Sequence, residues 1–224
     1  VLVTIVDEIT KTLYDGISTE EIYRRAFALL REHRRDAAAY YSLKRAILEF
    51  GPSGFPFEAY LGELFRAEGW GATTDQIVQG ACVEHEVDVV LTRPKEIIYV
   101  EAKFHNTAAF KTDLKTVLYV KARIDDLRAA YPKQNIKGLV VTNTKFTSKA
   151  VQYATCEGLE LLGWEYPHKG NLHERIEAAR LYPITALTTL SKHEKVALLA
   201  GNHVLCSSLL GHPDILESVG VRGK

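Results

Sequence analysis

Two carboxylates and a lysine occur on neighbouring segments that have the composition of β-strands. Asp88 lies within Val87–Leu91, and Glu101 and Lys103 lie at the end of Ile97–Lys103. Both segments are short and rich in β-branched residues, which is typical of strands. Paired carboxylates suit a hard divalent cation such as Mg²⁺, and a nearby ammonium can orient a nucleophile or offset transition-state charge. These residue types therefore indicate metal-assisted hydrolysis of a phosphodiester.

The turn between the two segments sets which residues face each other. Residues 93–96 form a predicted four-residue loop, and this loop length places Asp88 opposite Glu101. Lys103 lies two residues beyond Glu101 and should therefore project from the same face of the sheet. Facing carboxylates destabilise a sheet, a cost that a bound cation would remove. The alternative interpretation is a pair of strand-edge charges with a lysine salt bridge, because this pattern of residues often occurs by chance.

A third carboxylate can come from the helix that precedes these strands. This helix is predicted at 55–68 and ends at Gly69. Glu58 flanks its buried stripe, whereas Glu63 points to the opposite side. Glu58 is therefore either a member of the site or an ordinary surface acid, and both interpretations stay open. The predicted stripe consists of Phe57, Tyr60, Leu61, Leu64 and Phe65.

The elements that must position these residues follow in an order typical of an α/β fold with a mixed sheet flanked by helices. Outside this core the chain is helical. We therefore predict a helical segment at 1–50, an α/β domain at 51–168 and a helical accessory segment at 169–224, with Gly51-Pro52 marking the first boundary. The predicted core elements are a helix at 55–68, strands at 74–78, 87–91 and 97–103, a helix spanning 114–127, a strand at 138–142, a helix at 148–157 and a strand at 159–162.

Capping patterns define the helices of the two flanking segments. Ser18 with Glu21 is a predicted capping box, and Ser191 with Glu194 is another. The other predicted limits in these segments are a helix at 37–50, a helix end at Gly201 and a helix start at Pro213.

Composition and charge narrow the class of protein. Hydrophobic residues make up 46% of the chain and charged residues 25%, which is ordinary for a folded protein. No apolar run approaches the roughly 18 residues of a membrane span. Three widely spaced cysteines and the lack of a leader favour a cytoplasmic protein. The formal net charge is zero, but residues 103–149 contain ten Lys or Arg against three Asp. This excess fits DNA as a partner about as well as it fits a solvated helix face.

Basic and polar residues flank the proposed acids. Four basic residues on the helix after Lys103 would, as phosphate clamps, give salt-sensitive binding without sequence preference. His85, His105 and Asn106 can contact phosphate or water, although such residues are more often strand-end hydrogen-bonding groups. Cys82 and His85 have a zinc-like spacing, but structural zinc needs four ligands, which disfavours a zinc site. The four basic residues are Lys111, Lys115, Lys121 and Arg123.

Four segments of the core carry a family resemblance, namely Gly80–Asp88, Tyr99–Asn106, Leu139–Ala150 and Leu159–Trp164. They resemble Mrr-like restriction endonucleases of the PD-(D/E)xK superfamily and the related archaeal Holliday-junction resolvases. The resemblance covers about 55–164 and implies a restriction-endonuclease-like fold. It also implies that Asp88 and Glu101 bind Mg²⁺ or Mn²⁺. Lys103 would then assist catalysis, and Glu58 would complete the site.

A second resemblance lies upstream, at 13–23, where the sequence reads Leu-Tyr-Asp-Gly-Ile-Ser-Thr-Glu-Glu-Ile-Tyr. This stretch resembles the second half of an ATP-cone, a small regulatory domain that binds ATP or dATP. The opening strands of the cone do not occur in this sequence, which also contains no Met. We therefore expect the chain to be part of a longer protein. The resemblance implies ATP or dATP as a regulatory ligand without identifying a binding residue.

The sequence thus favours a Mg²⁺-dependent endonuclease that acts on DNA and carries helical regulatory or accessory segments. One rival is a nucleotide-responsive DNA-binding protein that does not cleave, although a pure binder has no need of opposed carboxylates. The other is a Holliday-junction-type resolvase, which would act as a homodimer with paired sites. Residues 188–210 resemble a helix-hairpin-helix module, with a helical lid or a dimerisation element as the alternative.

Overall fold

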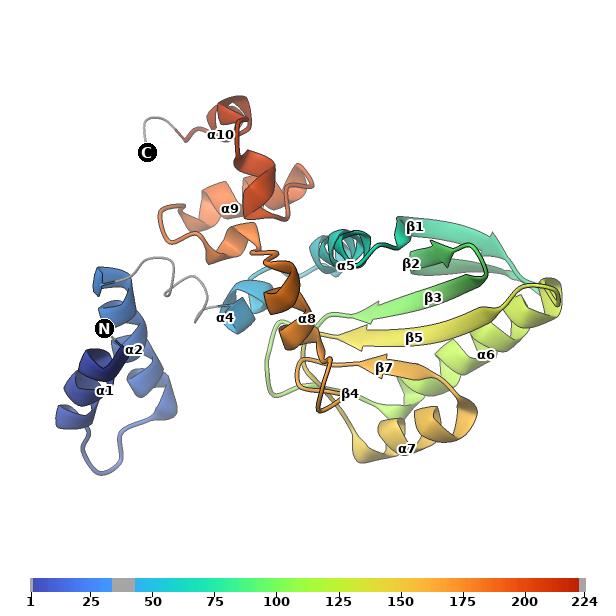
Figure 1. Ribbon diagram of the computed structural model, residues 1–224, viewed down its shortest axis with the longest axis horizontal. Coiled ribbons are helices and arrows are strands. Elements are labelled where there is room, and N and C mark those ends of the chain that lie inside the picture. The colour runs from blue at the N-terminus through green and yellow to red at the C-terminus, as the bar shows by residue number, and fades with distance from the viewer. Residues whose placement is uncertain (1, 34–42, 222–224) are drawn as a thin grey trace.

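A five-stranded mixed sheet forms the centre of the protein, with helices on both of its faces (Figure 1). This computed structural model describes residues 2–33 and 43–221 of the 224-residue chain. The predicted fold class, a mixed sheet flanked by helices with helical segments at both ends, is confirmed. In their order across the sheet the strands are β1 (Gly71–Gln79), β2 (Glu84–Arg93), β3 (Glu96–Lys103), β5 (Ile136–Thr142) and β7 (Glu160–Leu162).

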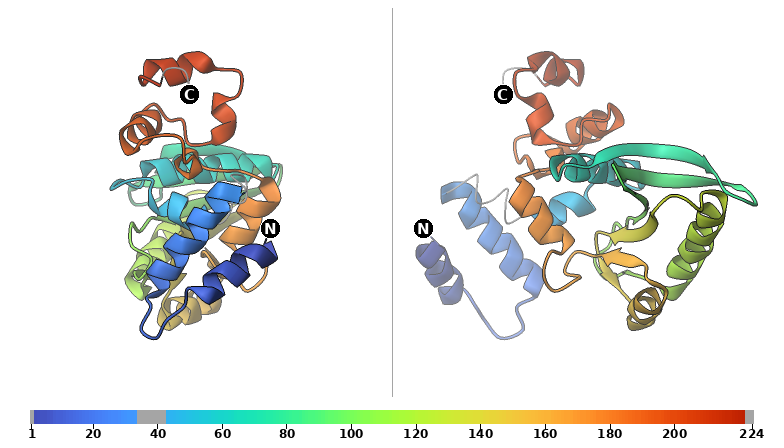
Figure 2. Two further views of the ribbon diagram at one scale, coloured as in Figure 1. Left: turned by 90° about the vertical axis from the view of Figure 1, so that its left-hand side faces the viewer. Right: turned by 45° about the vertical axis from the view of Figure 1, so that its right-hand side comes forward.

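The sheet combines an antiparallel half with a parallel half. Strand β2 pairs antiparallel with both β1 and β3, whereas β3, β5 and β7 pair parallel to one another. Parallel neighbours need crossover connections, which α6 (Leu114–Ala130) and α7 (Ser148–Glu157) supply. These two helices pack on one face of the sheet, and α5 (Phe55–Ala67) packs on the other (Figure 2).

Two hydrophobic cores lie on the two faces of the sheet. The stripe predicted for α5 is confirmed, because all five of its side chains are at most 1% exposed. Burying each such side chain contributes about 1.5–3 kcal/mol. On the opposite face, α6 buries four residues against the sheet and α7. The residues that α6 buries are Val117, Val120, Ile124 and Leu127.

Local signals fix the ends of these helices. The side chains of Asp113 and Thr147 accept backbone N–H bonds at the starts of α6 and α7. Helix α7 ends at Gly158, whose φ of +67° is the left-handed conformation that glycine adopts without steric cost. Gly69, with φ +82°, follows the end of α5 as predicted.

The β2–β3 hairpin has the predicted register, with Thr92 paired to Ile97. Its turn is shorter than predicted, because Arg93 and Glu96 also pair and leave only residues 94–95 outside the ladder. Adding a pair at the end of an antiparallel ladder does not shift the register. The sequence prediction missed a two-stranded sheet, in which β4 (Lys111–Thr112) pairs parallel with β6 (Lys145–Phe146).

The N-terminal segment begins with two helices, α1 (Leu2–Lys11) and α2 (Thr19–His33), which share a small apolar cluster. The capping box predicted there forms only in part. The Ser18 hydroxyl accepts the Glu21 N–H, but the Glu21 carboxylate bonds Tyr14 and Arg25 instead of the cap. Of the helix predicted at 37–50, residues 37–42 lie outside the described part, and α4 (Leu43–Leu48) covers most of the remainder.

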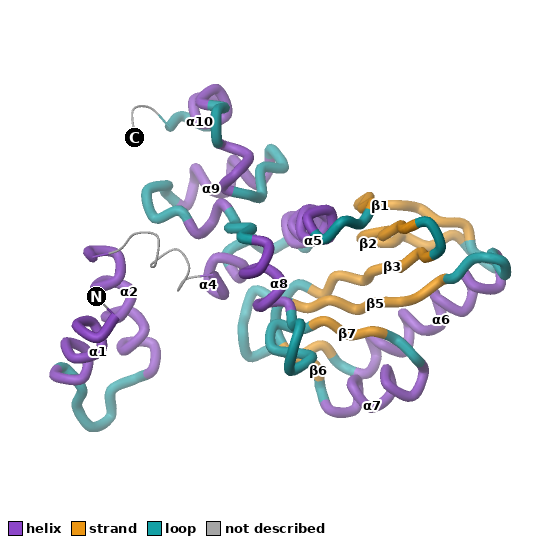
Figure 3. The backbone as a smooth tube through the Cα atoms, in the orientation of Figure 1, coloured by secondary structure: helices purple, strands orange, loops and turns teal. Residues whose placement is uncertain are grey.

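The C-terminal segment consists mainly of short helices joined by loops (Figure 3). The capping box of Ser191 and Glu194 is confirmed in both directions, and Gly201 and Pro213 mark helix limits as predicted. Residues 188–210 contain one α-helix and one 3-10 turn, whereas a helix-hairpin-helix unit has two α-helices. The elements are α8 (Leu172–Ala179), η1 (Ile184–Ala186), α9 (Lys192–Ala200), η2 (Cys206–Leu209) and α10 (Pro213–Ser218).

Both flanking segments contribute to the core of the α/β unit. Leu43 and Ile47 of α4 belong to the same buried cluster as α5, as do Leu172 and Ile176 of α8. The Tyr60 hydroxyl of α5 also donates to a carbonyl of the C-terminal segment at 2.6 Å. The predicted boundaries at 50 and 168 stay predictions, and packing is continuous across both. No helix among residues 2–33 and 43–221 has the length and apolar character required to cross a membrane.

Candidate active site

The two predicted acids lie where the β2–β3 hairpin opens. The ladder between these strands ends at the pair Val89–Val100, one step before Asp88 and Glu101 would face each other. Beyond that pair, β2 continues against β1 and β3 continues against β5. The Asp88 Oδ2 atom accepts the backbone N–H of Ala102 at 2.6 Å. The carboxylate therefore binds a backbone group of β3 at the point where the two strands separate.

Strand β2 also turns over at this position. Residues two apart on a regular strand share a face, yet Val87 lies in the core under α6 and α7 whereas Val89 lies in the core under α5. On the neighbouring strand, Asp75 has φ +54°, a left-handed conformation that is rare for residues other than glycine. Both strands are thus irregular at the level of Asp88. The prediction that the acids share one face of a regular hairpin is correct in register but omits this local rotation.

Glu101 is the most enclosed member of the site, with only 3% of its surface exposed. Its Oε1 atom accepts bonds from the Lys103 ammonium, at 2.6 Å, and from the Tyr119 hydroxyl. Its Oε2 atom pairs with the Arg123 guanidinium at 2.6 Å. Both carboxylate oxygens therefore have protein donors, and two of the three donors carry a positive charge.

Tyr119 and Arg123 come from α6, and sequence reasoning did not assign them to the site. Arg123 stood among the predicted phosphate clamps, and Tyr119 was not considered. Their spacing of four residues places them on one face of the helix, and the Arg123 guanidinium lies 5.1 Å from the centre of the Tyr119 ring. This spacing was visible in the sequence. Which face of α6 meets Glu101 was not, because that depends on how the helix crosses the sheet.

Burial and like charges raise the pKa values of two nearby acids. Burial, and then the charge of Glu101, raise the pKa of Asp88 to about 6, against the opposing effects of the Ala102 N–H and the Lys103 and Arg123 charges. Burial is also the main cause that raises the pKa of Glu58 to about 7, followed by the charge of Asp88. Glu58, in the first turn of α5, is therefore close enough to Asp88 to sense it. Glu63 instead pairs with Arg66 at the surface.

The carboxylates suit a hard divalent cation. Three further acids, Asp75, Glu86 and Glu101, also raise the pKa of Glu58, so negative charge accumulates around the opening of the hairpin. An ion that prefers oxygen ligands would relieve this repulsion. Among the described residues no three Asp, Glu, His or Cys side chains form a ready-made metal cage. A cation at Asp88 and Glu101 would therefore need backbone, water or substrate oxygens as its other ligands.

Buried polar residues of β5 and its following loop hold the backbone around Lys103. The Thr142 hydroxyl donates to the Lys103 carbonyl at 2.8 Å. The Asn143 side chain, only 1% exposed, bonds both backbone groups of His105, at 2.7 and 2.8 Å. The His105 ring lies 3.2 Å from the Thr112 hydroxyl, and burial followed by the Lys103 charge lowers its pKa. These bonds fix the point at which the chain leaves the site.

The other predicted basic residues divide into two pairs. Lys111 and Lys115 are exposed. Lys121 binds Asp125 at 2.6 Å, and Arg123 binds Glu101. Of these four residues, Lys111 and Lys115 are the two whose side chains are exposed and could bind a DNA phosphate at the surface.

The Cys82 and His85 pair has a structural partner. Asp126 of α6 accepts the Cys82 N–H at 2.9 Å and lies 2.8 Å from the His85 ring. These bonds tie the β1–β2 turn to α6. Neither residue belongs to a three-residue metal group in the described part of the chain.

Comparison with known proteins shows that Glu58, Asp88 and Glu101 lie within the part of the chain that matches a known protein family. A restriction endonuclease family model matches residues 52–164, and an AF1548-like C-terminal model matches residues 182–224. An uncharacterized protein of Archaeoglobus fulgidus is 36% identical over 165 residues, which are 73% of this chain and 92% of that protein. The crystal structure of AF1548, a protein of unknown function, is similar with a TM-score of 0.65 and 33% identity, covering 76% of this chain and 90% of that one.

Proposed function

Because this chain belongs to the restriction endonuclease family, we propose that it is a Mg²⁺- or Mn²⁺-dependent endonuclease that hydrolyses DNA phosphodiester bonds. The observation that carries the proposal is the grouping of Asp88, Glu101 and Lys103 at the open end of the β2–β3 hairpin. Two carboxylates with an ammonium beside them are the residue types that such hydrolysis needs.

Each residue has a distinct proposed role. Asp88 and Glu101 would hold the divalent ion, which when bound activates water and stabilises the leaving oxygen. Lys103, already 2.6 Å from Glu101, would orient the attacking water and offset charge on the phosphate. Glu58, with its raised pKa, would accept or hold a proton at the edge of the site.

Nicking of supercoiled plasmid tests this proposal. The protein is incubated with DNA in Mg²⁺, Mn²⁺ or EDTA, together with the variants Asp88→Ala and Lys103→Ala. Asp125→Ala is the matched control, because this carboxylate is half exposed and pairs with Lys121 away from Glu101. We expect nicking only with the metal ions, and only in the wild type and the control. Equal nicking in EDTA, or in all variants, would show that the site is wrongly assigned.

The same assay separates the two rival functions. A DNA-binding protein without cleavage activity would shift DNA in a gel but leave the plasmid supercoiled at every metal concentration. A Holliday-junction resolvase would cut a synthetic four-way junction in preference to the matching linear duplex, and would sediment as a homodimer. The negative charge accumulated around Asp88 supports cleavage over binding alone, because carboxylates repel a DNA backbone unless a cation intervenes.

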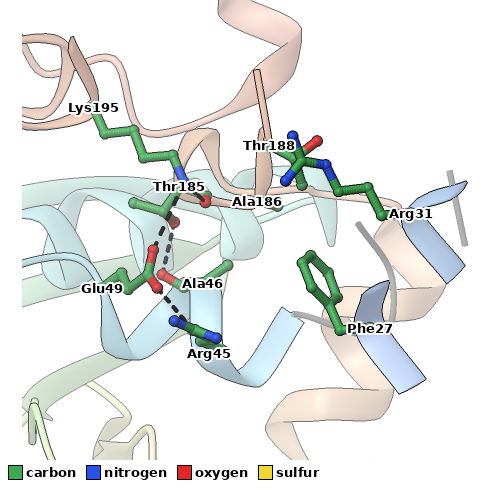
Figure 4. Close-up of a pocket in the computed structure, with 9 residues that line it drawn as sticks. All are labelled: Phe27, Arg31, Arg45, Ala46, Glu49, Thr185, Ala186, Thr188 and Lys195. Atoms are coloured by element: carbon green, nitrogen blue, oxygen red, sulfur yellow. Dashed lines mark hydrogen bonds and ion pairs between the residues drawn. The ribbon is translucent and has the colours of Figure 1, made fainter. Parts of the chain in front are cut away.

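A second proposal concerns regulation by ATP or dATP. A cavity of about 180 Å³ lies where α2, α4, η1 and α9 meet (Figure 4). Phe27 and Arg31 of α2 lie on one side of it, and Arg45 and Lys195 lie on the other. Glu49 is the one acidic side chain among its lining residues, and it pairs with Arg45 at 3.0 Å and with Lys195 at 3.7 Å. Arg31 adds a third positive charge, so the lining carries a net positive charge. A cationic cavity with an aromatic ring suits the phosphates and base of a nucleotide.

Calorimetry tests this second proposal. ATP, dATP and inorganic triphosphate are titrated into the wild type, Arg31→Gln and the control Arg24→Gln. Arg24 lies on the same helix but is not among the residues that line this cavity. We expect the two nucleotides to bind the wild type and the control, with weaker binding to Arg31→Gln. Equal affinity in all three proteins would remove this cavity as the site.

A further inference from the structure

We propose that Arg123 is an additional residue of this active site, which neutralises Glu101 in the free protein and moves to a DNA phosphate when Glu101 takes the divalent ion. The inference rests on the proposed nuclease function. It adds a positioning residue and a physical reason why DNA and the ion should bind together.

The first observation is that the oxygens of Glu101 are already occupied. Lys103 and Tyr119 donate to Oε1, and Arg123 pairs with Oε2 at 2.6 Å. A buried carboxylate needs such partners, because an unpaired charge in the protein interior is costly. A divalent ion that binds Glu101 must share or replace at least one of these donors.

The second observation identifies Arg123 as the donor that can leave. Its side chain is 16% exposed, and among the described residues it contacts the Glu101 carboxylate and the face of the Tyr119 ring. The Lys103 ammonium, in contrast, is the amine proposed above to orient the attacking water, so it would stay in the site. A change of side-chain torsions alone would release the Arg123 guanidinium, without any movement of α6.

The third observation is an open groove that Arg123 helps to line. Tyr119 and Ala122 line it on α6, and the β1–β2 turn lines its other side. The acidic residue in this groove, Asp126, cannot readily capture the freed guanidinium, because it already accepts bonds from the turn and from His85. A phosphate that enters the groove would therefore be the available anion for Arg123.

Electrostatics then couples the two ligands. A guanidinium beside Glu101 opposes the approach of a second cation, whereas a phosphate offers that guanidinium a bidentate partner of matching geometry. Drawing Arg123 away frees one oxygen of Glu101 and removes the competing positive charge. By linkage, DNA must then strengthen ion binding by the same factor as the ion strengthens DNA binding.

Calorimetric titration of Ca²⁺ and Mn²⁺, with and without a mixed-sequence DNA duplex, tests the inference without measuring cleavage. The proteins are the wild type, Arg123→Gln, Arg123→Lys and Asp88→Ala. Arg128→Gln is the matched control, because Arg128 lies on the same helix and bonds the Ile136 carbonyl instead of the site. Thermal melts accompany each titration, and Arg123→Lys retains the positive charge if Arg123→Gln unfolds.

We expect DNA to tighten ion binding to the wild type about fivefold or more, the lower end of usual coupling factors. Without DNA, Arg123→Gln should bind the ion more tightly than the wild type, and DNA should add little. Arg128→Gln should behave as the wild type, and Arg123→Lys should show a smaller coupling, because lysine keeps the positive charge but not the bidentate geometry. If Arg123→Gln binds the ion as the wild type does, or more weakly, while Asp88→Ala abolishes binding, the inference is wrong and the proposed metal site stands. If no protein binds an ion even with DNA, the proposed metal dependence fails, and the inference fails with it.

Discussion

Two carboxylate sites of this protein behave in opposite ways. At the β1–β2 turn, Asp126 accepts a bond from the His85 ring and from two backbone N–H groups, and these donors lower its pKa to about 2. At the open end of the β2–β3 hairpin, burial and neighbouring acids raise the pKa of Asp88 to about 6 and that of Glu58 to about 7. The first site is complete without a ligand. The second has more negative charge than its protein donors neutralise.

This difference distinguishes an acid that holds a fold together from an acid that is available for chemistry. Donors stabilise the ionised form of Asp126 and thereby fasten a turn to a helix. Repulsion destabilises the ionised form of Asp88, so the site gains free energy when a cation binds. Perturbed acids in such surroundings often mark functional sites. Four changes would break or sharpen the comparison.

The largest effect is expected on nicking. Replacing Asp88 by Asn removes a proposed metal ligand and should lower the nicking rate about 100-fold or more, the scale of losing one key electrostatic contact in catalysis. The same change at Asp126 should leave the rate close to that of the wild type. Plasmid assays at pH 8 in Mg²⁺ compare the two variants. A similar loss in both would contradict the division into a structural and a catalytic acid.

Glu58→Gln should have a smaller effect, about tenfold in rate, as is usual when a group that supports a metal ligand is lost. Wild-type activity should rise with pH as Asp88 ionises around its pKa of about 6. Glu58, with a pKa of about 7, is still mostly protonated when Asp88 ionises, so Glu58→Gln should leave the midpoint of this rise unchanged and remove any further change in rate around pH 7. Raising the Mg²⁺ concentration should move the midpoint to lower pH, because a cation favours the ionised acid. A change in rate around pH 7 that persists in Glu58→Gln would show that Glu58 is not its source.

Thermal stability should change in opposite directions at the two sites. The raised pKa of Asp88 means that its ionisation destabilises the fold as pH rises from about 4 to about 6, and the penalty is complete above that range. Asp88→Asn should therefore raise Tm at pH 8 in EDTA by a few degrees and leave it unchanged at pH 4. Asp126 stabilises the fold above its ordinary pKa and loses this effect as pH falls towards 2. Asp126→Asn should lower Tm at pH 8, as measured by circular dichroism.

The smallest effect is expected for the exposed lysines Lys111 and Lys115. Lys115→Ala should weaken DNA binding only a few-fold, and it should reduce the slope of log affinity against log salt by about 1, the value of one phosphate contact. Lys137, which pairs with Glu96 at 2.6 Å, supplies the control. Fluorescence anisotropy over a range of salt concentrations measures both slopes. An equal change in the two variants would show that Lys115 has no specific place on the DNA.

What the sequence could predict depended on local periodicity and turn length. The register of the β2–β3 hairpin and the buried stripe of α5 followed from these features alone, and both agree with the structure. The end of the ladder at Val89–Val100 could not be predicted in this way, because it coincides with irregular backbone at Asp75 on a third strand, which periodicity does not encode. A turn of two residues in place of four left the register intact, so that error had no effect on the site.

The hydrogen-bonding partners of Glu101 could not be predicted from the sequence for a different reason. Tyr119 and Arg123 look like an ordinary pair of surface residues one turn apart on an amphipathic helix. Only the crossing of α6 over β3 brings them to the Glu101 carboxylate. The acid-acid-lysine pattern could be found by residue type, whereas its supporting donors require tertiary structure.

The hydrophobic core that the flanking segments share with the α/β unit limits where this unit can be truncated. A fragment trimmed to the family match at 52–164 would lose Leu43, Ile47, Leu172 and Ile176, which belong to the same buried cluster as the α5 stripe. That helix carries Glu58, so weaker packing of α5 would displace this acid from the open end of the β2–β3 hairpin. The flanks are therefore part of the same folded unit, and exchange of this unit between proteins would have to include them.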